Sequence, residues 1–358
     1  MSYKNNYYKI LLTVIILLSI GIFSLTGEEG FKKEPPLKDN LVFKQLMWAF
    51  IAILIFLFSY FWGYRRFLDI SIPLYFVVLG LLLLVLAYGP IRSGAQRWLK
   101  LFGLNFQPAE FAKLAMILSV TRYFVSHKDE IKKTMVFIVA LTMVILYILL
   151  IFLQPDLGSA VILIPIFISI AFICNVNKKN ILVLFLLGLL FSPLSWHILK
   201  DYQKQRILVF VNPNVDPLGA GYTVIQSKIA IGSGKIFGKI WLKKTTQFSF
   251  LPESHTDFIF ASIGEKLGFL GTSLIILIYY LLLREILSIG IVTADLEGKA
   301  ITVGIATMLF LHIFINIGMS LGILPVVGIP LPFISYGGSN LVLNMMALGI
   351  VASIEKEH

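Results

Sequence analysis

The sequence has little charge and almost no cysteine. Only 14% of its 358 residues are charged, and Cys174 is the single cysteine. One cysteine cannot form an internal disulfide, and it excludes a cysteine-rich metal site. Phosphate-binding loops of the Gly-Lys-Ser/Thr type and the glycine fingerprint of dinucleotide-binding domains are also missing from the sequence. If the protein is an enzyme, its chemical energy must therefore arrive with the substrate.

Apolar residues are abundant instead. They make up 58% of the chain, which contains 29 Phe, and the mean hydropathy is +0.89. A run of about 20 apolar residues can cross the hydrocarbon core of a bilayer as a helix. The sequence therefore predicts an all-α polytopic membrane protein with ten transmembrane helices, forming one integral membrane domain over residues 1–358. The ten runs are 9–26, 42–62, 70–89, 108–125, 135–153, 157–174, 180–199, 268–290, 300–323 and 337–354.

The short loops predict the orientation of these helices. Lysine and arginine collect on the side that holds the N-terminus, which by the positive-inside rule places both termini in the cytoplasm. A long connection at residues 200–267, between the seventh and eighth helices, then lies outside. Residues 219–232 within it are apolar enough for a short amphipathic helix at the membrane interface.

This outer connection is also basic. Residues 200–256 hold eight Lys and Arg against three Asp and Glu, a net charge of +5. Such a segment can attract an anionic substrate or a lipid headgroup. Ordinary solvated lysines would give the same composition, so charge alone leaves both interpretations open.

Three polar sites lie at the edge of the predicted spans. Glu110 and Lys113 share one helix face because they are three residues apart, so they form either a buried ion pair that joins helices or the polar lining of a cavity. Asp156 follows a tight turn and is placed to cap the sixth helix, and as a second interpretation it contacts substrate in the cavity. Trp98 lies in an outer loop, where tryptophan commonly contacts lipid headgroups and, as a second interpretation, could face a substrate.

Asp257 has two equally open interpretations. It stands directly before an apolar stretch, beside His255 and near Glu253. Partial dehydration and a nearby carboxylate would raise its pKa toward a value useful to a general base. Alternatively, Asp257 is simply the N-cap of the helix that follows.

Seven motifs follow one another along nearly the whole chain. They are Gln107-Pro-Ala-Glu110-Phe-Ala-Lys113, Gln154-Pro-Asp156-Leu-Gly158-Ser-Ala, Phe210-Val-Asn-Pro213, Gly221-Tyr222, Gln226-Ser227, Leu251-Pro-Glu253-Ser-His255-Thr-Asp257-Phe-Ile-Phe-Ala and Pro332-Phe-Ile-Ser-Tyr336-Gly-Gly-Ser339. Together these motifs resemble the SEDS family of cell-wall proteins. Within that family, the compact length and short tails resemble the elongation group, RodA, more than the division group, FtsW, or the sporulation group.

The resemblance implies a peptidoglycan glycosyltransferase in the bacterial cytoplasmic membrane, with its active site facing outward. Such an enzyme polymerises lipid II, and a class B penicillin-binding protein, a transpeptidase, cross-links the product. Asp257 matches the family's catalytic carboxylate, here a general base for the acceptor hydroxyl, with undecaprenyl diphosphate as leaving group. Glu110 and Lys113 match positions that line the central cavity, and Trp98 matches an outer tryptophan associated with activity.

Further residues are expected near the substrate. The leaving diphosphate needs a positive charge, which Arg206, the lysines of the outer connection or a divalent cation, Mg or Mn, could supply. The sequence contains no dedicated metal cage. His255 and Glu253 belong to the motif of Asp257, and Glu265 is carried over although Lys266 replaces the second residue of the family's frequent acidic pair. The loop at 238–244 also departs from the family pattern.

Two rival functions stay open: a lipid II flippase or other transporter, and a non-catalytic scaffold for the penicillin-binding protein. A flippase needs charged groups through the depth of the bilayer. Glu110, Asp156 and Asp257 all fall toward the outer side of the predicted topology, which favours chemistry at the surface. Expected partners are lipid II, the penicillin-binding protein and membrane lipids, with no nucleic acid.

Overall fold

The computed structural model describes residues 6–26, 40–90, 96–101, 104–217, 219–239 and 253–357, and the described chain is almost entirely helical. A two-stranded antiparallel hairpin, β1 (Leu99–Leu101) with β2 (Leu104–Phe106), is the sheet within this part. The α-helices are α1 (Asn6–Thr26), α2 (Leu41–Trp62), α3 (Tyr64–Asp69), α4 (Ser71–Tyr88), α5 (Pro108–Ser126), α6 (Thr134–Leu153), α7 (Leu157–Ile173), α8 (Lys178–Ile198), α9 (Asp201–Val211), α10 (Ala220–Ser233), α11 (Ile259–Val292), α12 (Leu296–Leu321) and α13 (Gly338–Glu357). Short 3-10 helices are η2 (Lys128–Glu130) and η3 (Pro213–Val215).

Seven of the described helices, namely α1, α2, α4, α6, α11, α12 and α13, are long and apolar enough to cross a membrane. Many large apolar side chains on them are exposed, as expected for surfaces that face lipid tails. The chain is therefore a multi-pass membrane protein. The other three predicted spans coincide with α5, α7 and α8. That all ten cross the bilayer stays a prediction.

The long connection predicted at residues 200–267 contains regular structure. Helix α9, the 3-10 helix η3 and helix α10 occupy its first part, and α10 confirms the helix expected at residues 219–232. Helix α11 begins at Ile259, nine residues before the predicted start of the eighth span. Residues 240–252 of the segment, with Lys243 and Lys244, lie outside the described residues.

The early part of α11 is separated from the rest by a kink at Gly268. This glycine has φ 68° and ψ −163°, a conformation that side chains disfavour. The kink leaves backbone N–H groups of α11 without acceptors in the preceding turn, and carbonyl groups of the residues after α10 accept their hydrogen bonds instead. Phe269 N donates to Lys235 O at 2.8 Å, and Leu270 N donates to Ile236 O at 3.1 Å. The chain leaving α10 is thus attached to the middle of α11.

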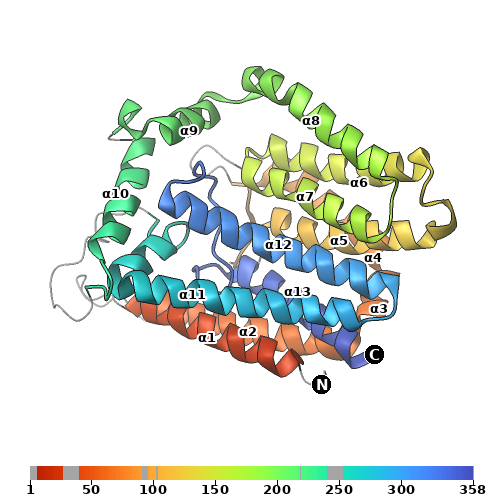
Figure 1. Ribbon diagram of the computed structural model, residues 1–358, viewed down its shortest axis with the longest axis horizontal. Coiled ribbons are helices and arrows are strands. Elements are labelled where there is room, and N and C mark those ends of the chain that lie inside the picture. Colours follow the sequence, from red (N-terminus) through yellow and green to blue (C-terminus); the bar gives the residue numbers. More distant parts are fainter. Residues whose placement is uncertain are drawn as a thin grey trace.

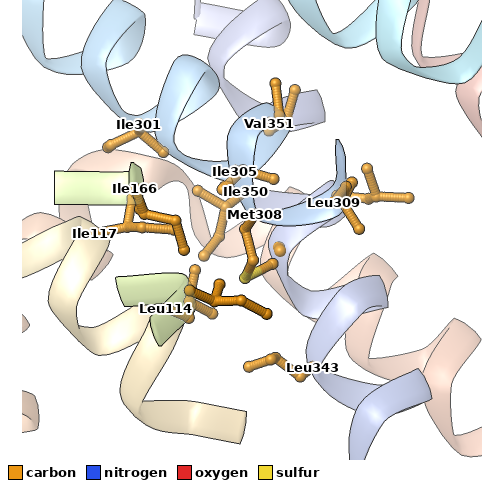
Figure 2. Close-up of a cluster of buried hydrophobic side chains, with 14 of the residues drawn as sticks. Leu114, Ile117, Ile166, Ile301, Ile305, Met308, Leu309, Leu343, Ile350 and Val351 are labelled. Carbon is orange, nitrogen blue, oxygen red and sulfur yellow. The ribbon is translucent and has the colours of Figure 1, made fainter. Parts of the chain in front are cut away.

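The centre of the bundle is formed by α5, α7, α12 and α13. Figure 2 shows their apolar side chains interdigitating, with Leu114 and Ile117 from α5 against Met308 and Ile305 from α12. All four side chains are almost fully buried. Helices α1 and α2 pack along one side of this centre, and α8, α9 and α10 follow one another in an arc along its opposite side (Figure 1).

Candidate active site

Asp257 lies in the turn that leads into α11. The N-cap of α11 is Phe258, which makes no side-chain capping hydrogen bond. The interpretation of Asp257 as a helix cap is therefore wrong. Its side chain is half-buried. Its carboxylate has no hydrogen-bond partner among the described residues, while its backbone oxygen accepts a hydrogen bond from Asn316 Nδ2 at 2.9 Å.

A pocket of about 180 Å³ surrounds this carboxylate. Four segments that are distant in sequence form it: α9, α10, the turn before α11 and the segment after α12. We call it the Asp257 pocket. It is lined by Arg206, Val209, Phe210, Thr223, Val224, Glu253, Asp257, Phe258, Leu324, Pro325 and Val326. One cationic and two acidic side chains therefore face a mostly apolar space.

Burial raises the pKa of Asp257 to about 6. Removing water disfavours the charged form of a carboxyl group, and this is the largest cause. The carboxylate of Glu253 raises the pKa further, whereas Arg206 and Arg97 lower it and Asp156 adds a small rise. Asp257 is therefore poised between its protonated and ionised forms close to neutral pH.

Two contacts hold the guanidinium group of Arg206. Its Nη1 donates to Val326 O at 3.2 Å, and its guanidinium carbon lies 5.9 Å from the centre of the Tyr202 ring. Burial lowers the pKa of Arg206, but arginine stays protonated in proteins. The pocket thus has a fixed positive charge that can bind an anionic group.

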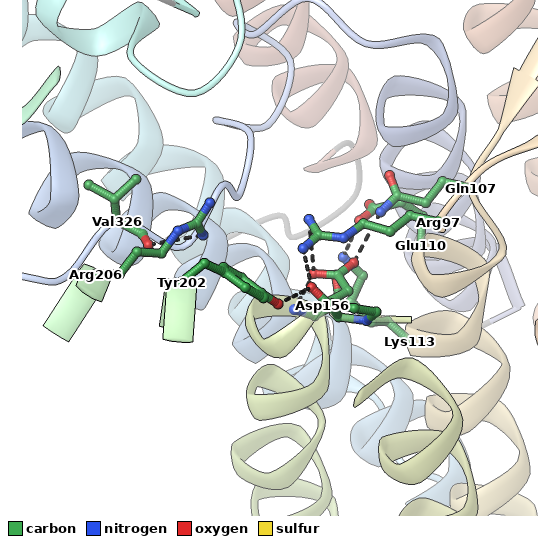
Figure 3. A network of polar contacts seen from close by, with 10 residues as sticks. Arg97, Gln107, Glu110, Lys113, Asp156, Tyr202, Arg206 and Val326 are labelled. Atoms are coloured by element: carbon green, nitrogen blue, oxygen red, sulfur yellow. Dashed lines mark hydrogen bonds and ion pairs between the residues drawn. The ribbon is translucent and has the colours of Figure 1, made fainter. Parts of the chain in front are cut away.

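A second cluster of polar side chains surrounds Asp156, beside α9 (Figure 3). Asp156 is the N-cap of α7, as predicted, and its Oδ2 accepts from Ser159 Oγ at 2.9 Å and from Gln107 Nε2 at 3.2 Å. Arg97 forms an ion pair with it at 3.8 Å and donates to Pro155 O. These contacts join α7 to the chain on both sides of the hairpin. A contact of Asp156 with substrate stays a prediction.

Glu110 and Lys113 form the expected ion pair, with 2.8 Å between Oε1 and Nζ. Both side chains are buried, at 4% and 1% exposure. Lys113 Nζ also lies 2.8 Å from His312 Nε2 on α12, and Asn340 Nδ2 on α13 donates to Glu110 Oε2 at 2.8 Å. The pair therefore links α5 to α12 and α13, which confirms its structural interpretation. Its role in a substrate cavity stays a prediction.

The other predicted residues lie outside the Asp257 pocket. Trp98 directly precedes β1 and is half-buried. Glu265 is fully buried on α11 and pairs with Lys239 at 2.9 Å. His255 belongs to the segment of Asp257, and its ring lies edge-on to that of Tyr336 with 6.2 Å between centres. The structure therefore brings Asp257, Glu253 and Arg206 together in one pocket, and Trp98, Glu265 and His255 do not line it.

The match to known proteins covers almost the whole described bundle. A family model described as cell cycle protein, FTSW_RODA_SPOVE, matches residues 8–358. The chain belongs to this family. The SEDS family that the motifs resemble is therefore confirmed.

Individual members of the family are similar over most of their length. The peptidoglycan glycosyltransferase MrdB of Escherichia coli K12 is 44% identical over 287 residues, which cover 78% of this chain and 76% of MrdB. A chain from a structure of a peptidoglycan synthase complex that coordinates polymerization and crosslinking has a TM-score of 0.83 and 28% identity, covering 98% and 97% of the two chains. RodA of Thermus thermophilus has a TM-score of 0.71 and 25% identity, covering 98% and 96%.

The described residues offer few ligands for a divalent cation in this SEDS protein. They contain no group of three or more His, Cys, Asp or Glu side chains that could hold a metal. Among the described residues, two carboxylates, Asp257 and Glu253, line the Asp257 pocket. A cation with several oxygen ligands would need its remaining ligands from elsewhere, so the described residues do not fit a resident divalent cation.

Two residues near Asp257 were not predicted from the sequence as parts of the site. Asn316 lies within the apolar helix α12 and is fully buried. A polar residue in a predicted membrane span was the signal that could have identified it. Ser335 lies within the quoted motif at residues 332–339, and its Oγ donates to Thr256 O at 2.7 Å.

Proposed function

We propose that this SEDS protein is a peptidoglycan glycosyltransferase of the elongation type, which joins lipid II disaccharide units into glycan strands. Membership of the family and the relative named as such an enzyme support the reaction class. The observation that carries the proposal for the active site is the half-buried carboxylate of Asp257, in a pocket that also holds the cation Arg206.

In the proposed reaction the 4-hydroxyl oxygen of the acceptor sugar attacks the anomeric carbon of the donor. The carboxylate of Asp257 takes the hydroxyl proton as the new C–O bond forms. The bond between the anomeric carbon and the diphosphate oxygen breaks, and undecaprenyl diphosphate leaves with the bonding electrons. A general base works best with a pKa near the working pH, and Asp257 meets this condition. Arg206 stabilises the negative charge that develops on the diphosphate.

The other polar residues have supporting roles in this proposal. Glu110, Lys113 and Trp98 line the route of the substrate, and Asp156 holds the adjoining turn. His255 and Glu265 keep the chain on both sides of Asp257 in place. The contacts of Glu110 with Asn340, of Asp156 with Gln107 and of Glu265 with Lys239 support this arrangement.

The same proposal includes the placement in the membrane. All ten spans cross the bacterial cytoplasmic membrane, both termini are cytoplasmic, residues 1–358 form one domain, and the Asp257 pocket faces outward. The distribution of lysine and arginine supports this orientation. A class B penicillin-binding protein is the proposed partner, since a similar chain occurs in a peptidoglycan synthase complex.

Polymerisation of purified lipid II tests the proposal. The solubilised protein with its class B partner should make long glycan strands, and Asp257→Asn, which keeps the shape and removes the base, should make none. Asp129→Asn on the exposed η2 is the matched control and should polymerise normally. Equal products from wild type and Asp257→Asn would remove Asp257 from the mechanism. No polymer from either, in a preparation that moves lipid II across vesicles, would instead indicate a flippase.

A further inference from the structure

Asn316 joins two segments that form the Asp257 pocket. Its side chain is fully buried on α12, and its Nδ2 donates both hydrogens. One goes to Asp257 O at 2.9 Å and the other to Ile329 O at 2.7 Å. A buried donor of this kind is strongly favoured to keep its partners, because losing them leaves polar groups unsatisfied. The two backbone segments are thereby held at a fixed distance.

Ser335 makes a second connection to the same turn. Its Oγ donates to Thr256 O at 2.7 Å and accepts from Leu331 N at 2.8 Å. Next to it, Tyr336 N donates to His255 O at 2.9 Å. Together with Asn316, these groups bind three consecutive carbonyl oxygens of the chain before α11. This part of the chain has no helix or strand of its own to hold it.

The carboxylate of Asp257 itself has no such support. No described residue donates a hydrogen bond to it, so its position follows from that of its backbone. Gly328, with φ +77°, passes beside it, and a Cβ at this glycine would lie 3.2 Å from Asp257 Oδ2. Gly328 precedes Ile329, whose oxygen Asn316 binds. Asn316 therefore controls both the carboxylate and the chain that packs against it.

We propose that Asn316 and Ser335 are positioning residues for Asp257, holding its backbone so that the carboxylate stands at a fixed place and depth in the pocket. The expected effect on catalysis rests on the proposed function. The expected effect on the position of the Asp257 carboxylate rests on the hydrogen bonds alone. Neither residue touches the reacting atoms. Without them the turn shifts and water reaches the carboxylate more easily.

The pKa of Asp257 reports how deeply its carboxylate is buried. The charged groups that face it are Glu253 on its own turn, Arg206 on α9, Arg97 before β1 and Asp156 at the start of α7. A substitution at Asn316 or Ser335 removes none of these charges. Since burial is the main cause of the raised pKa, a carboxylate that becomes more hydrated should titrate at lower pH.

The test compares Asn316→Leu and Ser335→Ala with wild type and with Thr302→Val. Thr302 is a fully buried residue of the same helix α12, and its hydroxyl has no hydrogen-bond partner among the described residues. The first measurement is modification of Asp257 by a hydrophobic carbodiimide, which reacts with protonated carboxyl groups, followed by mass spectrometry across pH. The second is kcat and KM for lipid II polymerisation with the class B partner.

In wild type and Thr302→Val, the modification of Asp257 should fall by half near pH 6. In Ser335→Ala and Asn316→Leu this midpoint should move down by about one pH unit. The value of kcat should fall by about 10- to 100-fold, the effect of a small misplacement of a catalytic group. KM should change by less than about twofold, because neither residue binds substrate.

An unchanged midpoint in folded Ser335→Ala and Asn316→Leu would overturn the proposal, since a purely structural role lowers the amount of folded protein without moving the titration. A raised KM with unchanged kcat would also overturn it, by assigning both residues to substrate binding. If wild type makes no polymer, the proposed function fails, and the modification midpoint still decides whether Asn316 and Ser335 position Asp257.

Discussion

In the proposed reaction, the carboxyl group of Asp257 has to be dehydrated enough to keep a raised pKa and accessible enough to reach the acceptor sugar. Its pKa of about 6 predicts the pH dependence of polymerisation. The base must be ionised, so the rate should rise with pH and reach half its maximum near pH 6. Glu253→Gln removes a negative charge that raises this pKa, so the midpoint should move to lower pH.

Initial rates of strand formation between pH 4.5 and 8 measure this midpoint. Asp129→Asn removes a remote, exposed carboxylate and should leave the curve in place. A midpoint that moves upward in Glu253→Gln, or a rate independent of pH over this range, would show that the fall in rate at acidic pH does not come from protonation of Asp257.

The buried pair of Glu110 and Lys113 gives a second prediction at the level of residues. Lys113→Met leaves the carboxylate of Glu110 buried without its cation. Breaking a buried pair in this way costs about 3–5 kcal/mol, so thermal unfolding in detergent should occur at a clearly lower temperature. The double variant Glu110→Gln with Lys113→Met removes both charges and should regain much of this loss. Equal stability of the single variant and wild type would show that the pair contributes nothing.

At the level of elements, the kink of α11 depends on Gly268. A Cβ there would lie 2.4 Å from Gly238 N, and φ is +68°. Gly268→Ala should therefore destabilise the protein by about 1–3 kcal/mol from backbone strain alone, with a further loss from the clash. Gly80→Ala on α4 is the control, because nothing lies within 4 Å of its added Cβ. It should be neutral or slightly stabilising, by up to about 1 kcal/mol.

Thermal unfolding of the two glycine variants, measured side by side in detergent, tests this prediction. A Gly268→Ala protein as stable as Gly80→Ala would mean that α11 can straighten without loss. The attachment of residues 235–239 to α11 would then be dispensable for stability.

At the level of the whole molecule, the orientation in the membrane can be measured directly. Replacing Cys174 by Ser removes the single cysteine, and one new cysteine can then be placed by Glu253→Cys or Asp129→Cys. Both positions are exposed. With the Asp257 pocket facing outward, an impermeant maleimide should label the Glu253→Cys protein in intact cells. The Asp129→Cys protein should be labelled only after the membrane is opened, and the reverse pattern would invert the topology.

Local patterns in the sequence were enough to predict the helices and several contacts. Each of the ten apolar runs coincides with a helix, because a chain in hydrocarbon must satisfy its backbone within the segment itself. The cap at Asp156 and the pair of Glu110 with Lys113 join residues three apart. These contacts follow from helix geometry alone.

The tertiary structure decided which side chains meet at Asp257. Arg206 reaches the pocket from α9, Asn316 is 59 residues from Asp257, and Ser335 is 79 residues from Thr256. No periodicity relates such positions, since they meet only when α9, α12 and the chain before α13 pack around one turn. The sequence by itself determined the helices, because these depend on local apolar patterns, and the resemblance of its motifs indicated Asp257. Its depth, its pKa and its supporting residues depend on packing between distant segments.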